Sequence, residues 1–187
     1  MHPSPWPVRV HDLLLRDPVE ADTEALLAFR NDPDVNRFMV HTHVDPDDLR
    51  RDLRGLADSA TDHTCVVERD GGVVAIGFLE VVDGPGQPGA PTGTDGLIGY
   101  VVDPRHARQG IGRATAHELL RACFERLGLR RVSAAAYADN PASVRILEAV
   151  GMRRERLSRQ ALWHAELGWI DEVGYAVLAE EWAARPA

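Results

Sequence analysis

The residues with the clearest potential for chemistry lie in a basic, glycine-containing segment, residues 103–114 (DPRHARQGIGRA). Gly110 and Gly112 stand where a helix is expected to begin, and glycine there lets backbone N–H groups approach an anion closely. The N-terminal end of a helix also favours negative charge. Three arginines would add charge-assisted hydrogen bonds, namely Arg105, Arg108 and Arg113. The segment therefore predicts a binding site for a diphosphate group.

Other structures also place glycines at the start of a helix. The glycines could simply allow the helix to pack closely on a sheet, and this alternative stays open. A dinucleotide-binding fold needs a tight strand-to-helix turn and three spaced glycines, whereas here several residues separate the strand from Gly110 and position 114 is alanine. A Walker loop needs a Gly-Lys-Ser/Thr sequence, which does not follow Gly112.

A second informative segment, residues 139–152 (DNPASVRILEAVGM), follows later in the chain. Asn140 is a favourable N-cap, Pro141 a favourable first helical residue, and Gly151 a favourable stop. These features predict a short helix, which is a sufficient structural explanation for the three residues. They do not explain why the segment is paired with the basic segment upstream.

Hydrophobic periodicity and turn residues predict the elements that would position both segments. Strands are expected at residues 8–15, 64–69, 73–82, 96–102, 131–137, about 153–165 and 171–179. Helices are expected at about 18–30, 46–57, 110–127 and 141–150, with a turn at 31–40. The Gly/Pro-rich residues 83–95 are expected to form a long hairpin loop. The order of elements predicts a mixed α/β sheet with helices on both faces.

Length and composition limit the class of protein. The 187 residues suit one domain, and the net charge of −8 without a dense Lys/Arg run argues against a nucleic-acid partner. No apolar run reaches the length of a membrane span, and the Pro-rich N-terminus does not have the pattern of a signal peptide. Cys65 and Cys123 form neither a disulfide framework nor a zinc motif. We therefore expect a cytoplasmic protein with reduced thiols and no metal.

The basic segment resembles the GNAT acetyltransferases, which carry Gln/Arg-x-x-Gly-x-Gly/Ala at a strand-to-helix junction. Gly110 and Gly112 match this motif, whereas Ala107 stands where the family has a polar residue. Arg105 or Arg108 could replace the contact that this polar residue would make.

The later segment resembles the family's second motif, Asn-x-x-Ser/Ala…Gly-Phe, at Asn140, Ser143 and Gly151. The order and spacing of the two motifs are those of the family. Other parts of the chain are similar to the RimJ/RimL-like branch of ribosomal-protein N-acetyltransferases. They are Leu14-Leu15-Arg16…Asp22, residues 31–35 (NDPDV), 98–104 (IGYVVDP) and 168–182.

The resemblance implies a GNAT fold over residues 8–182, with loose termini at 1–7 and 183–187. Such a fold is a twisted, mostly antiparallel α/β sheet that is splayed between two central parallel strands, here residues 97–102 and 131–137. Acetyl-CoA would bind in the splay. The residues expected to bind it are Tyr100, Val101, Val102, Arg105, Arg108, Gln109, Gly110, Ile111, Gly112, Arg113, Ala114, Asn140, Ser143 and Arg145.

Acetyl transfer to an amine needs a group that removes a proton from the ammonium and a group that protonates the departing thiolate. Glu80 is the expected base, because a glutamate inside a strand is disfavoured and requires a reason. Deprotonation through water is the alternative. The tyrosine that many GNAT enzymes use as the acid is Leu147 here, so the resemblance points to Ser143. Tyr100 and Tyr137 are alternatives, and the loop residues His41 and His43 lie where relatives contact the acceptor.

The resemblance therefore implies an N-acetyltransferase acting on a primary amine, such as a protein N-terminal α-amine. Two alternatives stay open. The acceptor could be a small amine such as an aminoglycoside or polyamine, or the protein could bind acyl-CoA without catalysis. A homodimer is common among relatives, and no nucleic-acid or membrane partner is expected.

Overall fold

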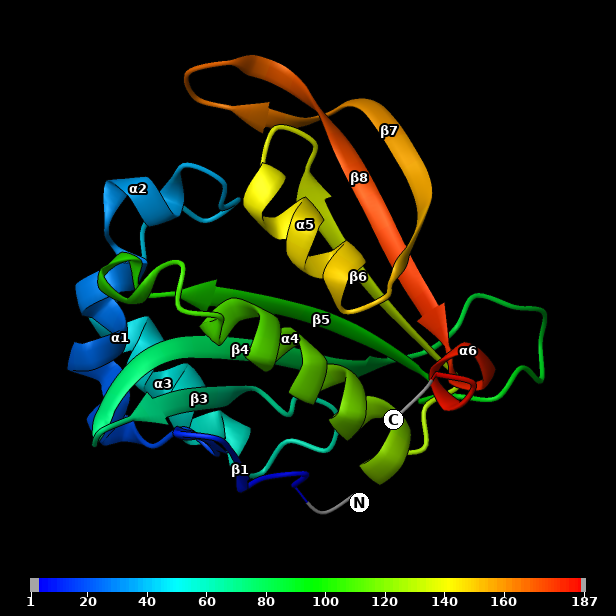
Figure 1. Ribbon diagram of the computed structural model, residues 1–187, viewed down its shortest axis with the longest axis horizontal. Helices are drawn as coiled ribbons and strands as arrows, with labels where there is room; N and C mark the ends of the chain where they lie inside the picture. The colour runs from blue at the N-terminus through cyan, green and yellow to red at the C-terminus, as the bar shows by residue number, and fades with distance from the viewer. Residues whose placement is uncertain (1–3, 186–187) are drawn as a thin grey trace.

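The computed structural model describes residues 4–185, and its strands form one eight-stranded sheet (Figure 1). The strands are β1 (Val8–Val10), β2 (Leu13–Arg16), β3 (Cys65–Arg69), β4 (Gly72–Val82), β5 (Asp95–Val102), β6 (Arg131–Tyr137), β7 (Arg153–His164) and β8 (Gly168–Leu178). Their spatial order is β1-β2-β3-β4-β5-β6-β8-β7. Among these described strands only β5 and β6 pair in parallel. The predicted mixed, mostly antiparallel sheet is confirmed.

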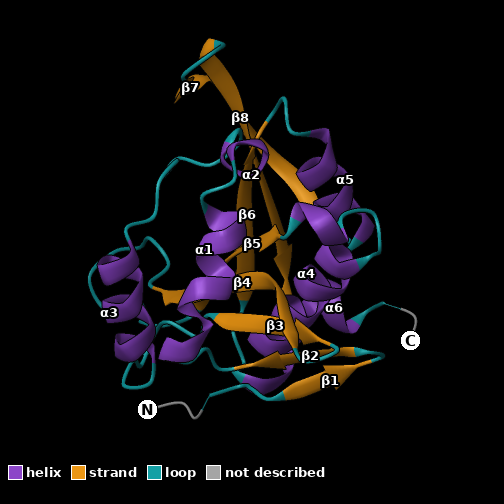
Figure 2. Ribbon diagram, turned by 90° about the vertical axis from the view of Figure 1, so that its left-hand side faces the viewer, coloured by secondary structure: helices purple, strands orange, loops and turns teal. Residues whose placement is uncertain are grey.

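Helices cover both faces of the sheet, as the sequence predicts (Figure 2). One face carries α1 (Thr23–Arg30) and α3 (Pro46–Leu56), and the other carries α4 (Ile111–Arg121) and α5 (Pro141–Ala149). Phe29 and Leu53 are buried in the core on the first face, and Leu119 and Leu147 in the core on the second. The shorter helices are α2 (Pro33–Asn36) and α6 (Ala179–Ala183).

Three expected boundaries are wrong. The single strand expected at residues 8–15 is a hairpin of β1 and β2, which turns at His11 with a φ of 52°. The turn contains no glycine or proline, so the sequence carries no strong signal for it. The helix expected from residue 18 begins at Thr23 after a 3₁₀ turn, and the helix expected to residue 127 leaves α geometry after Arg121. It continues as a π-helical turn over Ala122–Arg126.

The chain ends are packed wherever the structure describes them, although loose termini were expected. Trp6 is buried, and its indole Nε1 donates a hydrogen bond of 2.8 Å to the carbonyl oxygen of His63. The guanidinium of Arg185 donates to the carbonyl oxygens of Val150 and Gly151, at the end of α5. Residues 1–3 and 186–187 lie outside the described residues.

A network of charged side chains joins the sheet to α1. Arg16 donates two hydrogen bonds of 2.8 Å to the carboxylate of Asp22 and one of 2.9 Å to Glu68 on β3. Asp22 is buried and also accepts a bond from the backbone N–H of Val19. Burial raises the pKa of Asp22, but the bonds and charge of Arg16 outweigh it, and the net pKa is lowered. Because Asp22 immediately precedes Thr23, the network fixes the start of α1.

We predict that Asp22→Asn lowers the free energy of unfolding at pH 7 by about 1–3 kcal/mol, because Arg16 loses its charged partner. The lowered pKa means that this stabilisation is complete above the unfolded pKa of about 3.9 and disappears as the pH falls through the folded pKa. Urea unfolding at several pH values measures the effect. Glu24→Gln, which removes an exposed ion pair with Arg50, is the matched control, and an equal loss in both variants would contradict the prediction.

Candidate active site

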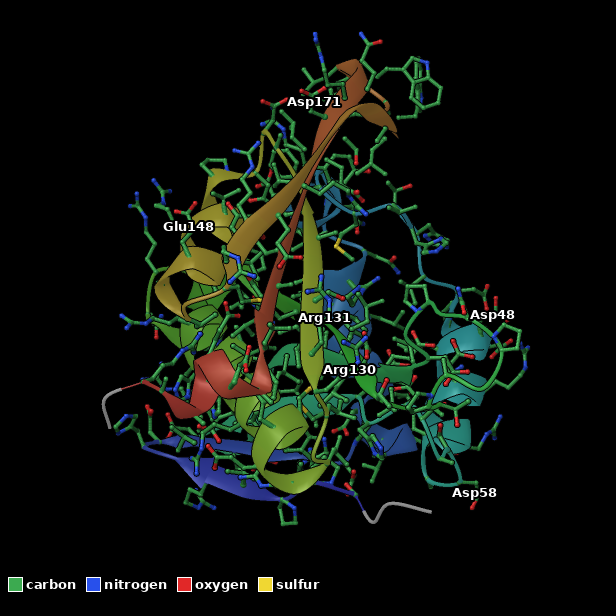
Figure 3. All side chains as sticks on the ribbon, turned by 90° about the vertical axis from the view of Figure 1, so that its right-hand side faces the viewer. Asp48, Asp58, Arg130, Arg131, Glu148 and Asp171 are labelled. Carbon is green, nitrogen blue, oxygen red and sulfur yellow. The ribbon has the colours of Figure 1, made fainter. Side chains whose placement is uncertain are left out.

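The parallel strands β5 and β6 separate after three residue pairs (Figure 1). The pairs are Asp95↔Arg131, Gly96↔Val132 and Leu97↔Ser133. In Figure 3, Arg131 lies toward the paired end, and Asp171 on β8 lies toward the opposite end. β5 stays paired with β4 through Val102, so the backbone groups of residues 98–102 that face β6 have no partner in the sheet. The predicted splay is therefore present.

A cavity of about 820 Å³ occupies the space between the separated strands and the elements around them. Its size lies in the range of small-molecule binding sites. Ten of the residues expected to bind the cofactor line it: Tyr100, Val101, Val102, Arg108, Gly110, Ile111, Gly112, Arg113, Asn140 and Ser143. The structure thus brings the two motif segments to one cavity.

The N-terminus of α4 opens into this cavity without a side-chain cap. Gly110 is the N-cap residue with a φ of 80°, a conformation that suits glycine. By contrast, α2, α3 and α5 begin with side-chain caps from Asp32, Asp45 and Asn140. The first N–H groups of a helix have no intrahelical partner. The first turn of α4 can therefore donate them to an anion.

Gly112 allows α4 to approach its neighbours closely. A Cβ atom at this position would lie 3.0 Å from the Cδ1 of Ile146 on α5 and 3.3 Å from the Cγ2 of Val102 on β5. The packing explanation of this glycine is therefore correct as well. It does not compete with the anion site, since the same close packing aims the first turn of α4 at the cavity.

Asn140 and Ser143 join α5 to the cavity wall. The Oδ1 of Asn140 accepts a hydrogen bond of 3.2 Å from the backbone N–H of Ser143, and so caps the helix. The hydroxyl of Tyr100 on β5 donates to the carbonyl oxygen of Ser143 at 3.4 Å. Asn140 therefore has a structural role, while Ser143 lines the cavity beside Tyr100.

Four expected cofactor residues do not line the main cavity. Arg105 pairs with the buried carboxylate of Asp103, at 2.6 Å from Nη2 to Oδ2, which caps the 3₁₀ turn Pro104–His106. Arg145 is exposed on α5. Gln109 and Ala114 line a neighbouring cavity of about 450 Å³.

Glu80, the expected base, also lies outside the main cavity. Its side chain is exposed, and it pairs across the sheet with Leu97, where β5 is still joined to β6. A strand glutamate can satisfy its carboxylate in water, so its presence in β4 does not require a catalytic role. Of the two loop histidines, His41 lines the cavity and His43 does not.

The sequence did not reveal an apolar part of the cavity. It is lined by Val35, Phe38, Met39, Phe78, Tyr137 and Leu162, and we call this set the acceptor chamber. Four of the six were not singled out because single apolar residues in a turn or strand look like ordinary core. The run from Val35 to Val40 after Asp34 was a detectable signal, since a turn rarely carries four large apolar residues without a purpose.

Two tyrosines of the cavity are neutral hydrogen-bond donors at physiological pH. Burial raises the pKa of Tyr100 to about 12, and the hydrogen bond to Ser143 only partly opposes this. Burial also raises the pKa of Tyr137. Neither phenol can serve as a base near neutral pH, whereas both can stabilise a developing negative charge.

Within residues 4–185, no three or more His, Cys, Asp or Glu side chains are placed to hold a metal ion. No helix in the same part of the chain combines the length and apolar character needed to cross a membrane. The chemistry of the described site therefore has to be sought in backbone groups, hydroxyls and charged side chains.

The fold and the cavity define a protein that holds an extended anionic ligand between two parallel strands. The chain belongs to the GNAT acetyltransferase family, because the family model described as "Acetyltransferase (GNAT) domain" matches residues 12–153. The sequence-based resemblance to this family is confirmed.

Known proteins similar to this chain support the same family. An uncharacterized N-acetyltransferase of Bacillus subtilis, YnaD, is 33% identical over 85 residues, which cover 46% of this chain and 49% of that protein. The chain thus spans about half the length of the curated relatives that it matches. The solved structure of Mycobacterium smegmatis RimJ in complex with CoA-disulfide is 26% identical, with a TM-score of 0.79, over 97% of this chain and 91% of that one.

A second solved structure shares the fold. Spermidine N-acetyltransferase from Vibrio cholerae, in complex with CoA and spermine, has a TM-score of 0.81 over 93% of this chain and 99% of that one. Its sequence is 16% identical, so it supports the fold alone. The RimJ structure supports the resemblance to the RimJ/RimL-like branch.

Proposed function

We propose that this protein transfers an acetyl group from acetyl-CoA to a primary amine by direct attack in a ternary complex. The observation that carries the proposal is the separation of β5 from β6 next to the uncapped N-terminus of α4. This arrangement offers unpaired backbone groups for an elongated ligand and helix N–H groups for its anionic end. Membership of the GNAT family supports the same activity.

The residues of the cavity fit the chemical groups of acetyl-CoA. The N–H groups of Ile111, Gly112 and Arg113 suit the diphosphate, and Arg108 lines the cavity beside them. The unpaired backbone groups of residues 98–102 suit the amides of the pantetheine arm. Acetyl-CoA supplies the thioester, whose carbonyl oxygen the backbone N–H groups of β5 would polarise.

Proton transfer needs little help from the protein when the acceptor is an α-amine. Such an amine has a pKa of about 7.7–8.0, so a useful fraction is neutral near pH 7. We propose that water removes the proton, because Glu80 lies outside the cavity. We propose Ser143 as the group that donates a hydrogen bond or proton to the departing thiolate. Tyr100 and Tyr137 are the alternatives for this role.

A protein N-terminal α-amine is the first acceptor to test, because the chain resembles RimJ at 26% identity. A small amine is the second candidate. The third is a module that binds acyl-CoA without catalysis, which Leu147 and Ala107 favour because they stand where many GNAT enzymes have polar residues. The buried free thiols Cys65 and Cys123 suit the cytoplasmic location predicted from the sequence, and a homodimer remains a prediction.

A thiol-release assay with acetyl-CoA and a panel of primary amines tests the proposal. We expect free CoA to appear only when an amine is present, at a rate that saturates with both substrates. Acetyl-CoA that raises the melting temperature without any thiol release would instead support the non-catalytic module. No binding of acetyl-CoA at all would overturn the assignment of the cavity.

We predict that Gly112→Asp weakens acetyl-CoA binding by at least about thirtyfold, because it places a carboxylate against the proposed diphosphate site. Gly112→Ala is the matched control, since it adds the same Cβ contact with Ile146 without a charge. Isothermal titration with acetyl-CoA, and circular dichroism to verify folding, measure both. Equal affinities of the two folded variants would contradict a diphosphate at α4.

We predict that Ser143→Ala lowers kcat at least about tenfold through loss of a proton donor. Glu80→Gln should leave kcat within about threefold between about pH 6 and pH 9, because Glu80 is exposed outside the cavity. Steady-state rates and acetyl-CoA affinities are measured for both variants. A pH-dependent loss of turnover in Glu80→Gln would reinstate Glu80 as the base, and a normal rate in Ser143→Ala would exclude Ser143 as the acid.

A further inference from the structure

The acceptor chamber is built by elements other than those that hold the proposed cofactor. Val35, Phe38 and Met39 come from α2 and the residues that follow it, Phe78 from β4 and Leu162 from β7. Val35, Met39 and Phe78 also pack against the core cluster on the α1 and α3 face of the sheet. The chamber thus lies largely on the face opposite to α4 and α5, with its side chains held by core packing.

Two asparagines hold the segment that carries Phe38 and Met39. The carboxamide of Asn31 donates to the carbonyl oxygen of Val44 at 3.0 Å and accepts from its N–H at 2.8 Å. The Nδ2 of the buried Asn36 donates to the carbonyl oxygen of Thr42 at 2.8 Å. The ring of Phe38 then packs 6.0 Å from the ring of Tyr137 on β6. The chamber is therefore formed before an acceptor arrives.

The carboxylates at this end of the cavity do not offer a buried, unpaired negative charge. Glu172 on β8 lines the cavity but forms an ion pair with Arg156. Asp34 lines it as well, but is an exposed residue of α2. His41 also lines the cavity and carries no negative charge in either protonation state.

The remaining ionisable groups beside the chamber make it less suitable for a second cation. The ring of His164 lies 6.0 Å from that of Phe38, and its Nδ1 accepts hydrogen bonds from the N–H groups of Glu166 and Leu167. That arrangement places the proton on Nε2 and keeps the imidazole neutral. Arg30 is 9% exposed, has no ion pair with a described residue, and lies over the Phe78 ring at 5.7 Å. Its charge repels another cation.

We propose that the acceptor is a primary amine whose neighbouring group is apolar, such as an aromatic or branched aliphatic side chain, and carries no second positive charge. The inference rests on the proposed acetyltransferase function and specifies its acceptor. An apolar group displaces water from the chamber walls. A second ammonium would lose its hydration without meeting an unpaired buried carboxylate. Polyamines and aminoglycosides therefore fit the chamber poorly.

Acceptors that share one reacting amine test the proposal. We would compare kcat/KM for tetrapeptide amides that differ only in their first residue, which is Phe, Ser or Lys, and for phenethylamine against spermidine. We expect the Phe peptide to exceed the Lys peptide at least about tenfold, and phenethylamine to exceed spermidine by a similar factor. A preference for the Lys peptide or spermidine would overturn this inference and leave the acetyltransferase function intact. No thiol release with any amine would overturn both.

A matched pair of substitutions on β7 tests the chamber itself. Leu162→Glu places a carboxylate in the acceptor chamber, and we expect the ratio of kcat/KM for the Phe and Lys peptides to fall at least about tenfold. Leu157→Glu adds the same charge at an exposed leucine of the same strand, outside the cavity, and should leave the ratio unchanged. Acetyl-CoA affinity, measured by titration, should be unchanged in both. An unchanged ratio in a Leu162→Glu protein that still binds acetyl-CoA would overturn the assignment of the chamber.

Discussion

The end of parallel pairing between β5 and β6 is the constraint on which the rest of the site depends. Pairing stops after Leu97 and Ser133, although both strands continue. β5 is held by β4 along its length and β6 by β8 from Arg131 to Tyr137, so the two strands cannot close the gap by bending locally. Buried backbone groups without partners are costly. A ligand that hydrogen-bonds to them recovers that cost, so the gap favours an elongated, amide-containing ligand.

The cavity divides two tasks between different kinds of groups. On the α4 side, binding depends mainly on backbone N–H groups, which Gly110 leaves uncapped and Gly112 brings close to β5. On the α1 side, binding depends on side chains, which are held by core packing and by the bonds of Asn31 and Asn36. Backbone groups read a ligand that does not vary, whereas side chains decide which amine is accepted.

Local signals in the sequence were sufficient for most of the fold and for the anion site. The alternation in β4, the cap at Asn140 and the glycines before α4 act within a few residues, so their effects can be inferred without knowing the fold. The exchange between Arg16, Asp22 and Glu68 explains why the first of the RimJ/RimL-like segments is similar, but its partners are far apart in the chain. The π turn after Arg121 and the hairpin turn at His11 have no residue signal of their own.

The catalytic assignments were less accessible for a physical reason. Whether Glu80 or Arg105 faces a cavity depends on where a strand ends and which neighbour claims the side chain. The structure leaves Glu80 exposed and pairs Arg105 with Asp103. The acceptor chamber draws on α2, β4, β6 and β7, which the sheet brings together only through its full topology. No single window of sequence contains that information.

The β7–β8 hairpin extends past the end of β6, so part of the chamber wall stands on a projection of the sheet (Figure 1). Its two register shifts already accommodate extra residues between Arg154 and Leu162. Insertions and substitutions there would reshape the chamber while the strands that hold the proposed cofactor keep their pairing. Descendants of such a protein can therefore acquire new acceptors through changes in one peripheral hairpin, and inherit the transfer chemistry unaltered.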